Sequence, residues 1–330
     1  MPIIRFNGNS YECPEAETVL QTLQASGVAL PHSCKVGACH TCLLRSLNGQ
    51  VPPAAQQGLR ETLRLQGFFL SCLCKPENDM DICLPENARL LGRAIVVAKD
   101  FLTPHICRVL LEPATPLYYH AGQFINLYRS DGLVRSYSLA SVPTHDRPLE
   151  IHVKRLQNGR MSNWICDNLQ VNDAIDFSGP HGECFYVSGK PDQALLLIGT
   201  GTGLAPLQGI VRDALYSGHK GPIHLYHGSR EHAGLYSIEL LNRLAEHYPH
   251  FHYTPCVSSE PSEPVSARAG RANDSAFSDF PNLSGWRVFL CGNPPMVRQA
   301  SKKAYLAGAD MADIYADPFE VADLRSKPRS

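Results

Sequence analysis

The pattern of hydrophobic and polar positions divides the chain into three regions of different character. In the first 90 residues, short extended runs flank an Asn-Gly turn, and the spacing of Val19, Leu20 and Leu23 predicts an amphipathic helix over 15–26. Two further short runs, LLRSLNGQV and DICLP, are typical of strands. These elements predict a small β-rich domain with one main helix.

The second region, from about Leu91, contains short β-patterned runs separated by Pro, Gly and Asp. Such spacing predicts an antiparallel barrel or sandwich, interrupted by one helix-like segment at 160–169. From about Asp192, buried strands alternate with helices, which predicts a parallel sheet with crossover helices. The stretch 258–285 is Ser/Pro/Asp-rich and is expected to be a connecting loop with a short helix near 274–279.

The composition fits a multi-domain globular protein. Of 330 residues, 44% are hydrophobic and 18% charged, which supplies enough apolar surface for two or three cores. The 30 basic and 31 acidic side chains leave a net charge of −1, so the chain lacks the basic footprint of a nucleic-acid-binding protein. No apolar run reaches about 18 residues, and the N-terminus lacks the pattern of a signal peptide. We therefore expect a cytoplasmic protein without a membrane span.

Twelve cysteines indicate metal or redox chemistry, because thiols in a reducing compartment are seldom paired as disulfides. Three lie on one short loop and a fourth follows on a distant strand, in the spacing C-x4-C-x2-C…C that suits a plant-type 2Fe–2S cluster. These four are Cys34, Cys39, Cys42 and Cys72. Gly37 between them lets backbone amides approach the sulfurs. The segment resembles the plant-type ferredoxin family, which implies that the four thiolates hold the cluster.

A zinc site is the alternative for these thiols. Zinc ribbons usually pair two Cys-x2-Cys knuckles, and here the second partner would be Cys72 with Cys74. That spacing is a poor match, so we expect the iron–sulfur cluster and interpret Cys74 as a small buried hydrophobic residue.

The second region carries a pattern suited to a flavin. Arg135 offers a bidentate fork to a pyrophosphate, Tyr137 a planar face, and Ser138 a hydroxyl within reach of the reactive flavin nitrogen. About twenty residues later, the run GRMS opens the predicted helix, and amides at a helix N-terminus can receive a second phosphate.

Together with the later SGPHG, these patterns resemble the ferredoxin–NADP reductase superfamily. The resemblance implies bound FAD, with Gly159, Met161 and Ser162 around its pyrophosphate. It also implies that the strand between the two patterns lines the cofactor, mainly through its backbone, which makes His152 and Lys154 candidate contacts.

In the third region a glycine-rich turn, GTGTGLAP, joins a buried strand to a helix. Backbone amides at such a turn can approach a pyrophosphate, with help from the helix dipole. The turn is not the Rossmann G-x-G-x-x-G, because Pro206 takes the place of the third glycine. It resembles the nicotinamide loop of the same superfamily, which implies contacts from Thr200, Gly201, Thr202, Gly203 and Pro206.

Further candidates lie at the ends of the last strands. Cys291 and Gly292 end the strand WRVFLCG and are expected to face the cleft, because ligands bind beyond the carboxyl ends of parallel strands. The resemblance places Cys291 near the nicotinamide, as a catalytic candidate beside Ser138, with simple packing as the alternative. It also implies that Phe319 covers the flavin. Arg230 suits either the 2′-phosphate of NADPH or the adenosine of NADH, and we favour NADH.

The three regions resemble the single-chain reductase components of bacterial multicomponent oxygenases, such as the benzoate dioxygenase and methane monooxygenase reductases. The resemblance implies a β-grasp 2Fe–2S ferredoxin domain at 1–88, an antiparallel β-barrel FAD domain at 92–188 and a parallel-sheet α/β NAD(P) domain at 189–330. The implied activity is an NADH-dependent oxidoreductase, in which FAD splits one hydride into single electrons for the cluster and an oxygenase partner.

Two alternatives share some of these features. The same electron transfer can serve a non-oxygenase partner, such as an iron–sulfur dehydratase in deoxysugar synthesis, and the sequence does not separate the two. The other alternative is a non-catalytic iron–sulfur or zinc scaffold with a degenerate flavin fold, which predicts a protein without flavin.

Overall fold

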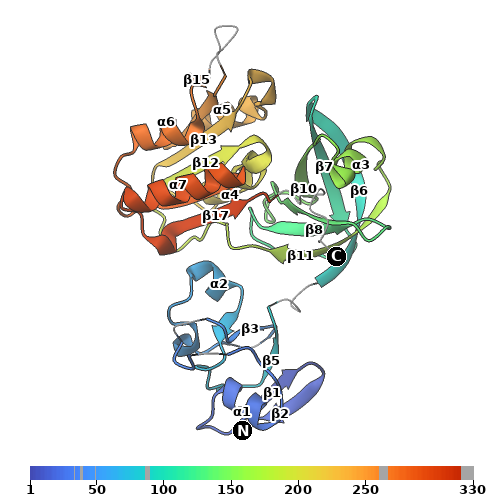
Figure 1. Cartoon of the computed structure of the whole chain (residues 1–330), viewed down its shortest axis with the longest axis vertical. Coiled ribbons are helices and arrows are strands. Elements are labelled where there is room, and N and C mark those ends of the chain that lie inside the picture. The colour runs from blue at the N-terminus through green and yellow to red at the C-terminus, as the bar shows by residue number, and fades with distance from the viewer. Residues whose placement is uncertain (33, 38–39, 49, 86–89, 260–266, 321–330) are drawn as a thin grey trace, which may run out of the picture. The chain divides into compact units, whose positions relative to one another are not determined.

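The computed structural model describes residues 1–32, 34–37, 40–48, 50–85, 90–259 and 267–320. Two compact units divide the chain, one of residues 1–90 and one of residues 91–330. The first contains one sheet, and the second contains an antiparallel sheet and a parallel sheet (Figure 1). No helix in these described ranges is long and apolar enough to cross a membrane.

The N-terminal unit is a five-stranded sheet of order β2-β1-β5-β3-β4 with short helices. Strands β1 and β5 pair in parallel, and the other pairs are antiparallel. Its elements are β1 (Ile3–Phe6), β2 (Asn9–Glu12), α1 (Val19–Ala25), β3 (Leu43–Ser46), η1 (Pro53–Gln56), α2 (Glu61–Leu65), β4 (Phe68–Leu70) and β5 (Met80–Cys83).

Helix α1 begins at Val19, four residues later than the sequence pattern predicts. Thr18 caps it, because the Thr18 hydroxyl accepts from the amide of Gln21 while the Gln21 side chain accepts from the amide of Thr18. This capping box satisfies two amides that would otherwise lack partners and fixes where the helix starts. Val19, Leu20 and Leu23 are buried in the core of the unit, as their spacing predicts.

The second unit begins with a six-stranded antiparallel sheet of order β10-β7-β6-β11-β8-β9. A bridge between Leu139 and Ile151 brings the end of β9 to β10, so the sheet curves toward closure as a barrel. Its elements are β6 (Leu90–Thr103), β7 (Ile106–Pro113), β8 (Phe124–Tyr128), β9 (Val134–Ser138), β10 (Leu149–Lys154), α3 (Arg160–Asp167) and β11 (Ala174–His181).

The rest of the second unit is a parallel sheet of order β15-β14-β13-β12-β16-β17. Helices α4 and α5 contribute to the core on one face, and α6 and α7 to the core on the other. Its elements are β12 (Leu195–Thr200), η2 (Gly201–Gly203), α4 (Leu204–Tyr216), β13 (Ile223–Ser229), η3 (His232–Gly234), α5 (Ile238–His247), β14 (Phe251–Val257), β15 (Arg268–Ala269), α6 (Ala272–Asp279), β16 (Arg287–Gly292), α7 (Pro294–Leu306), η4 (Met311–Asp313) and β17 (Ile314–Pro318).

The central strand β12 shows why this sequence forms a two-sided sheet. Leu195 and Leu197 pack toward α4 and α5, whereas Leu196 and Ile198 pack toward α6 and α7. A strand covered on both faces needs a continuous apolar run, which LLLI supplies. The predicted combination of a small β-rich domain, an antiparallel sheet that curves into a barrel and a parallel sheet with crossover helices is confirmed.

Candidate functional site

The cysteine loop of the N-terminal unit brings thiols together in the way a cluster needs. The sulfurs of Cys42 and Cys72 are 3.2 Å apart, and Cys34 is close enough to influence the Cys72 thiol. The amide of Gly37, a residue with φ of +81°, donates to the Cys72 sulfur. A Cβ on Gly37 would lie 2.5 Å from the Leu73 side chain, so the loop needs glycine to wrap this closely.

These thiols fit a 2Fe–2S cluster. Burial, together with the Cys42 thiol, raises the pKa of Cys72 to about 11, so the charge of a metal centre would be needed to ionise it. Cys39 lies outside the described residues. Among the residues that are described, no three ligand side chains are close enough to hold a metal ion, so the full four-cysteine arrangement stays a prediction from the spacing.

The second unit contains a cavity of about 1280 Å³. That volume exceeds the roughly 300–1,000 Å³ typical of a site for one small molecule. Both the barrel and the parallel sheet contribute to its lining. The structure brings together here most of the cofactor residues that the sequence predicts, namely Arg135, Tyr137, Ser138, His152, Lys154, Gly159, Met161, Ser162, Thr200, Gly201, Thr202, Arg230, Gly292 and Phe319.

Charge in the cavity suits phosphate-rich ligands. Its described lining includes the basic residues Arg135, Lys154, Arg160, Arg230 and Arg271. The two lining carboxylates, Asp317 and Glu320, both come from the end of the last strand. An excess of basic side chains favours dinucleotides, whose pyrophosphates carry negative charge.

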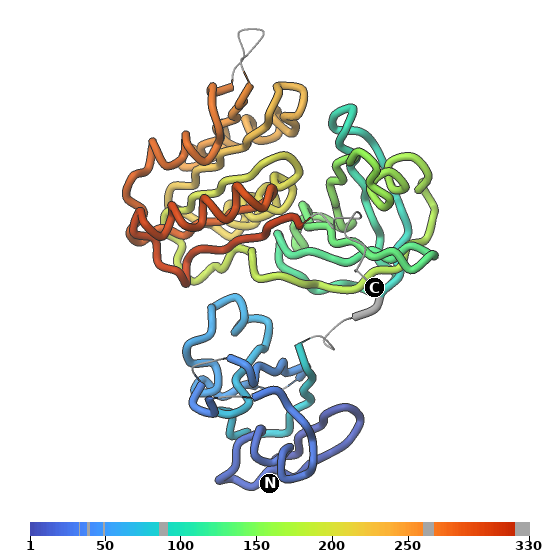
Figure 2. Tube along the Cα trace, viewed as in Figure 1, coloured from blue at the N-terminus to red at the C-terminus, as the bar shows by residue number. Residues whose placement is uncertain are grey.

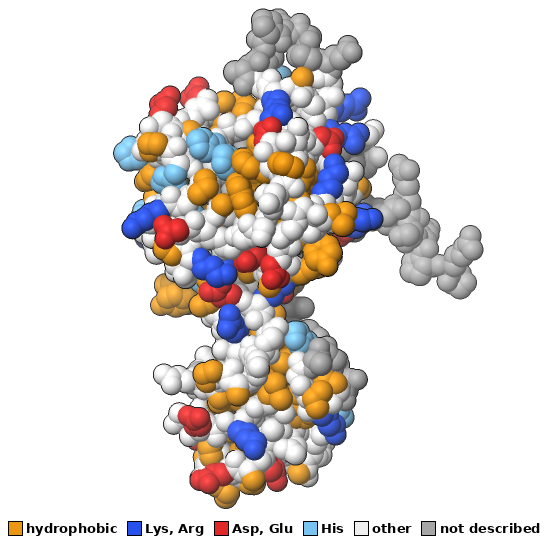
Figure 3. All heavy atoms as spheres, turned by 90° about the vertical axis from the view of Figure 1, so that its left-hand side faces the viewer, with side chains coloured by type: hydrophobic (Ala, Val, Ile, Leu, Met, Phe, Trp, Pro, Cys, Tyr) orange, Lys and Arg blue, Asp and Glu red, His pale blue; other side chains and the backbone are white. Residues whose placement is uncertain are grey.

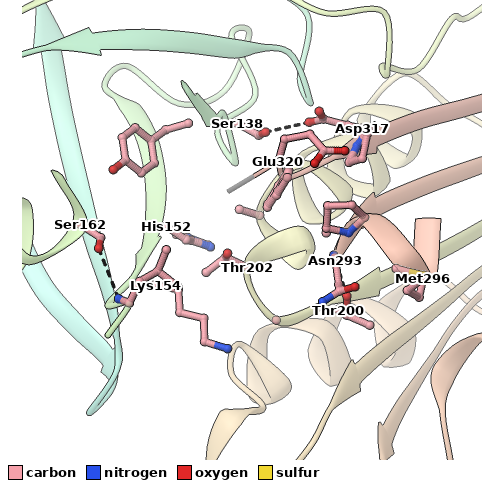
Figure 4. Close-up of a pocket in the computed structure, with 18 of the residues that line it drawn as sticks. Ser138, His152, Lys154, Ser162, Thr200, Thr202, Asn293, Met296, Asp317 and Glu320 are labelled. Carbon is pink, nitrogen blue, oxygen red and sulfur yellow. Dashed lines mark hydrogen bonds between the residues drawn. The ribbon is translucent and has the colours of Figure 1, made fainter. Parts of the chain in front are cut away.

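The barrel end of the cavity has the features of a flavin pyrophosphate site. Gly159 precedes α3, and a Cβ there would meet the Ser162 hydroxyl at 2.2 Å, so the turn requires glycine. The Ser162 oxygen accepts from the amide of Leu156 at 3.3 Å, which leaves its own hydrogen to donate to a phosphate (Figure 4). Arg135 reaches the cavity from β9.

Ser138 and Asp317 join the barrel to the last strand of the parallel sheet. The Ser138 hydroxyl donates to an Asp317 carboxylate oxygen at 2.9 Å, and both side chains line the cavity (Figure 4). Burial raises the pKa of Asp317, against the opposing effect of the Ser138 hydrogen bond. The pair can therefore hold a proton at the cavity wall more readily than an exposed carboxyl could. Figure 2 shows the same strand, in red, extending toward the barrel.

The glycine-rich turn packs against the end of β16. A Cβ on Gly203 would lie 2.3 Å from the Cys291 carbonyl oxygen, and one on Gly292 would lie 2.6 Å from the Thr200 carbonyl oxygen. Both glycines therefore allow backbones to approach. Pro206 lies in the first turn of α4, where a helix can do without its amide hydrogen. Gly203 and Pro206 support the turn without lining the cavity.

Cys291 lies beneath the cavity rather than on its wall. Its side chain is 0% exposed, and its sulfur is 3.6 Å from that of Cys184. Burial, together with the Cys184 thiol, raises the pKa of Cys291 well above its ordinary value. The thiol is thus neutral and unsuited to nucleophilic attack, whereas the neighbouring Gly292 does line the cavity.

The two candidates on β10 behave differently from each other. Both ring nitrogens of His152 have protein partners, Glu150 and the Tyr236 hydroxyl. Lys154 instead extends across the cavity, and its ammonium lies 4.0 Å from where a Cβ on Gly201 would be (Figure 4). The Lys154 charge therefore lies at the glycine-rich turn, on the nucleotide side of the cavity.

Comparisons with known proteins divide the chain into the three domains that the sequence predicts. The chain matches a 2Fe-2S iron-sulfur cluster binding domain over residues 4–77, an oxidoreductase FAD-binding domain over 96–186 and an oxidoreductase NAD-binding domain over 197–302. It is 35% identical to the reductase subunit of an aromatic O-demethylase from Amycolatopsis, over 92% of this chain and 93% of that protein. The chain belongs to the iron–sulfur flavoprotein reductases.

Further comparisons also match the chain over nearly its whole length. One match is the ferredoxin–NAD(P)(+) reductase component of naphthalene 1,2-dioxygenase/salicylate 5-hydroxylase systems from Ralstonia, 33% identical over 92% of this chain and 93% of that protein. The other is the solved cytochrome P450 reductase of Amycolatopsis, with 32% identity, a TM-score of 0.68, and coverage of 97% and 99%. The predicted cofactors, a 2Fe–2S cluster, FAD and NAD, are confirmed at the level of these domains.

The sequence analysis missed several site residues of this reductase. Asp317 lies within the terminal segment IYADPF, where only Phe319 was selected, although a carboxylate at the end of a parallel strand is a recognisable signal. Arg271 lies in a stretch expected to be a connecting loop. Tyr236, whose hydroxyl contacts His152 from a part of the chain far away in the sequence, carries no local motif.

Proposed function

We propose that this reductase takes hydride from NADH onto FAD and passes the electrons singly, through its 2Fe–2S cluster, to an oxygenase component. The observation that carries the proposal is the shared cavity, which barrel and parallel sheet line together within one unit. Bound FAD supplies the conversion between hydride and single-electron transfer. The residues of the chain bind, orient and shield the two dinucleotides.

For the flavin, we assign Arg135, Gly159 and Ser162 to its pyrophosphate, with Met161 beside them. Tyr137 offers its ring to the flavin. Ser138, held by Asp317, places its hydroxyl at the reacting edge of the ring. Phe319 lines the cavity, and its amide donates to the Gly292 carbonyl oxygen at 2.8 Å, which supports a role as a cover over the flavin.

For the nicotinamide coenzyme, we assign the pyrophosphate to the turn of Thr200, Gly201 and Thr202, with Lys154 as its cationic partner. Gly203 and Pro206 shape this turn, and Gly292 leaves room beside it. We assign Cys291 a part in shaping the nicotinamide site from below, because its thiol is buried and neutral.

The coenzyme choice depends on the adenosine end. Arg230 follows β13 and Arg271 precedes α6, and both line the cavity. Among the described lining residues, neither segment contributes a carboxylate. This charge suits a 2′-phosphate as well as a plain ribose. We therefore propose NADH as the coenzyme with NADPH accepted, and Arg230→Ala should lose activity with NADPH before activity with NADH.

An oxygenase is the partner class because the relatives named above serve an aromatic O-demethylase and a naphthalene dioxygenase system. A further relative is the reductase component of a phenol 2-monooxygenase from Pseudomonas, 31% identical over 96% of this chain. On the face drawn in Figure 3, positive and negative side chains are interspersed. Recognition there would depend on local contacts more than on long-range charge.

We also propose domain boundaries at 1–88, 92–188 and 189–330. The matched domain ranges 4–77, 96–186 and 197–302 lie inside them. The cytoplasm is the proposed location, since NADH is supplied there and cysteines outside the cluster loop, such as Cys13, Cys74 and Cys107, are not in disulfides.

A visible spectrum tests the proposed function. The purified protein should show flavin absorption together with the reddish-brown bands of a 2Fe–2S cluster, and anaerobic NADH should bleach both. Absence of flavin would instead support a non-catalytic scaffold. Bleaching of the flavin but not the cluster would contradict the proposed electron path. Transfer to an oxygenase is then measured by adding candidate oxygenase components and following NADH-dependent substrate oxidation.

A further inference from the structure

Tyr236 links the barrel to the parallel sheet below the coenzyme cavity. It lies between η3 and α5, and its side chain is 3% exposed. Its hydroxyl is 3.1 Å from Nδ1 of His152, which belongs to barrel strand β10 and lines the cavity. The other ring nitrogen of His152, Nε2, lies 2.7 Å from a Glu150 carboxylate oxygen.

The direction of these hydrogen bonds follows from their chemistry. Burial, and secondarily Glu150, raises the pKa of Tyr236 well above its ordinary value, so the hydroxyl keeps its proton and donates. Nδ1 of His152 then accepts, and Nε2 carries the hydrogen that is donated to the Glu150 carboxylate. One tautomer satisfies both contacts, so the imidazole is held from both sides.

From Tyr236 the contact continues toward the glycine-rich turn. The Tyr236 ring lies edge-on to the rings of both His152 and His227, with centroid distances of 5.2 and 5.5 Å. His227 is fully buried on β13 and is in register with Gly199, the residue on β12 just before the turn. Tyr236 therefore fills the space between the strand that lines the flavin side and the strand beside the nucleotide turn.

We propose that Tyr236 is a positioning residue for hydride transfer. It acts through His152, fixing the barrel at one spacing from the glycine-rich turn, so that the nicotinamide and the flavin meet at reacting distance. Hydride transfer requires reacting atoms about 3–3.5 Å apart, and a misplacement of about 1 Å can cost roughly a hundredfold in rate. This inference rests on the proposed function, because it assumes that both dinucleotides occupy the shared cavity.

The variant Tyr236→Phe tests the inference, because it keeps the ring and removes only the hydroxyl. The matched control is Tyr226→Phe on β13. The Tyr226 hydroxyl donates to an Asp279 carboxylate oxygen at 2.6 Å, and neither residue lines the cavity. Both proteins should unfold at a somewhat lower temperature than wild type, because each loses one hydrogen bond. Stopped-flow reduction of the flavin by saturating NADH should slow about tenfold in Tyr236→Phe only.

Two measurements distinguish a loss of nicotinamide positioning from a general loss of structure at the site. In Tyr236→Phe the dissociation constant for NAD⁺ and the FAD content should match wild type, and deuterium on the transferred position of NADH should still slow reduction. If Tyr236→Phe only weakens NAD⁺ binding, or if NADH reduces its flavin at the wild-type rate, the inference is wrong. If wild-type flavin is not reduced by NADH at all, the proposed function fails instead.

A second pair of variants covers the case in which Tyr236→Phe does not fold. His152→Asn keeps an acceptor near the position of Nδ1, whereas His152→Gln carries its amide nearer the position of Nε2. The inference expects faster flavin reduction in His152→Asn than in His152→Gln. Equal rates in these two variants would contradict it.

Discussion

At the scale of single residues, Arg135 is the side chain on which flavin retention should depend most. It reaches the cavity from β9, and the first residues of α3 line the same cavity. Arg135→Ala removes a charge-assisted contact worth about 1.5–3 kcal/mol, which corresponds to roughly 10–100-fold weaker FAD binding. Flavin fluorescence in the filtrate after dilution and ultrafiltration measures this loss.

Arg147→Ala is the matched control for that measurement. Arg147 lies on the same barrel, but its side chain is 87% exposed and pairs with Glu112 on the surface. It should retain flavin as wild type does. Equal flavin release from wild type and Arg135→Ala would remove Arg135 from the pyrophosphate site.

Asp213 on α4 gives the second unit a dependence of stability on pH. Burial raises its pKa to about 6, with His145 acting in the opposite direction. An unfolded aspartate has a pKa of about 3.9, so the folded state binds the proton more tightly. The protonated form therefore favours folding below about pH 4, and that contribution is lost as the pH rises toward 6.

Asp213→Asn should remove this loss of folding stability at higher pH, because asparagine does not ionise. We expect the variant to be more stable than wild type at pH 7.5 by about 1–2 kcal/mol, and by less at pH 5. Thermal unfolding at the two pH values measures the difference, with the exposed Asp192→Asn as control. A gain for Asp213→Asn that is equal at both pH values would contradict this origin.

The sequence predicts a site residue only where that residue acts together with its near neighbours in the chain. Arg135, Gly159 and the glycine-rich turn were found because each makes its contact through a short motif, and all line or shape the cavity. Asp317 and Tyr236 act on partners far away in the sequence. Their side chains acquire a function only after the barrel and the parallel sheet have folded together.

At the scale of elements, the glycine-rich turn depends on its approach to β16. Gly203→Ala would place a Cβ 2.3 Å from the Cys291 carbonyl oxygen, so the turn must shift. We expect flavin reduction by NADH to fall about 10–100-fold while FAD is retained. Gly132→Ala, at an exposed barrel turn with a φ of +82° and open space around it, should cost stability but leave the rate unchanged. A wild-type rate in Gly203→Ala would show that the turn tolerates the movement.

The apolar pattern predicts where most helices and strands lie. It does not predict where they begin and end, because hydrogen bonds such as helix caps set those positions. The strand LLLI was predicted from its continuous apolar run, and the helix after the turn from the spacing of its apolar residues. Helix α1 starts late because Thr18 caps it. Helix α7 was not predicted, although two prolines at its first positions mark a helix start.

At the scale of the whole molecule, the two compact units separate two kinds of electron transfer. The cluster thiols lie in the unit of residues 1–90, and the dinucleotide cavity lies in the unit of residues 91–330. Each unit has its own hydrophobic core. A change in one core should therefore leave the chemistry of the other unit nearly intact, since each unit packs around its own core.

Cys72→Ser tests this separation. It should remove the absorption of the cluster and the NADH-dependent reduction of cytochrome c, while flavin reduction by NADH stays within about twofold of wild type. Cys74→Ala is the matched control, because Cys74 is 0% exposed in the same core and its pKa is raised to about 12 by burial. Because Cys74 is a packing residue, the Cys74→Ala protein should be less stable than wild type but should keep the cluster. Loss of the metal centre in both variants would instead assign the thiols to a Cys72–Cys74 zinc knuckle, and loss of flavin reduction in Cys72→Ser would show that the two units work as one.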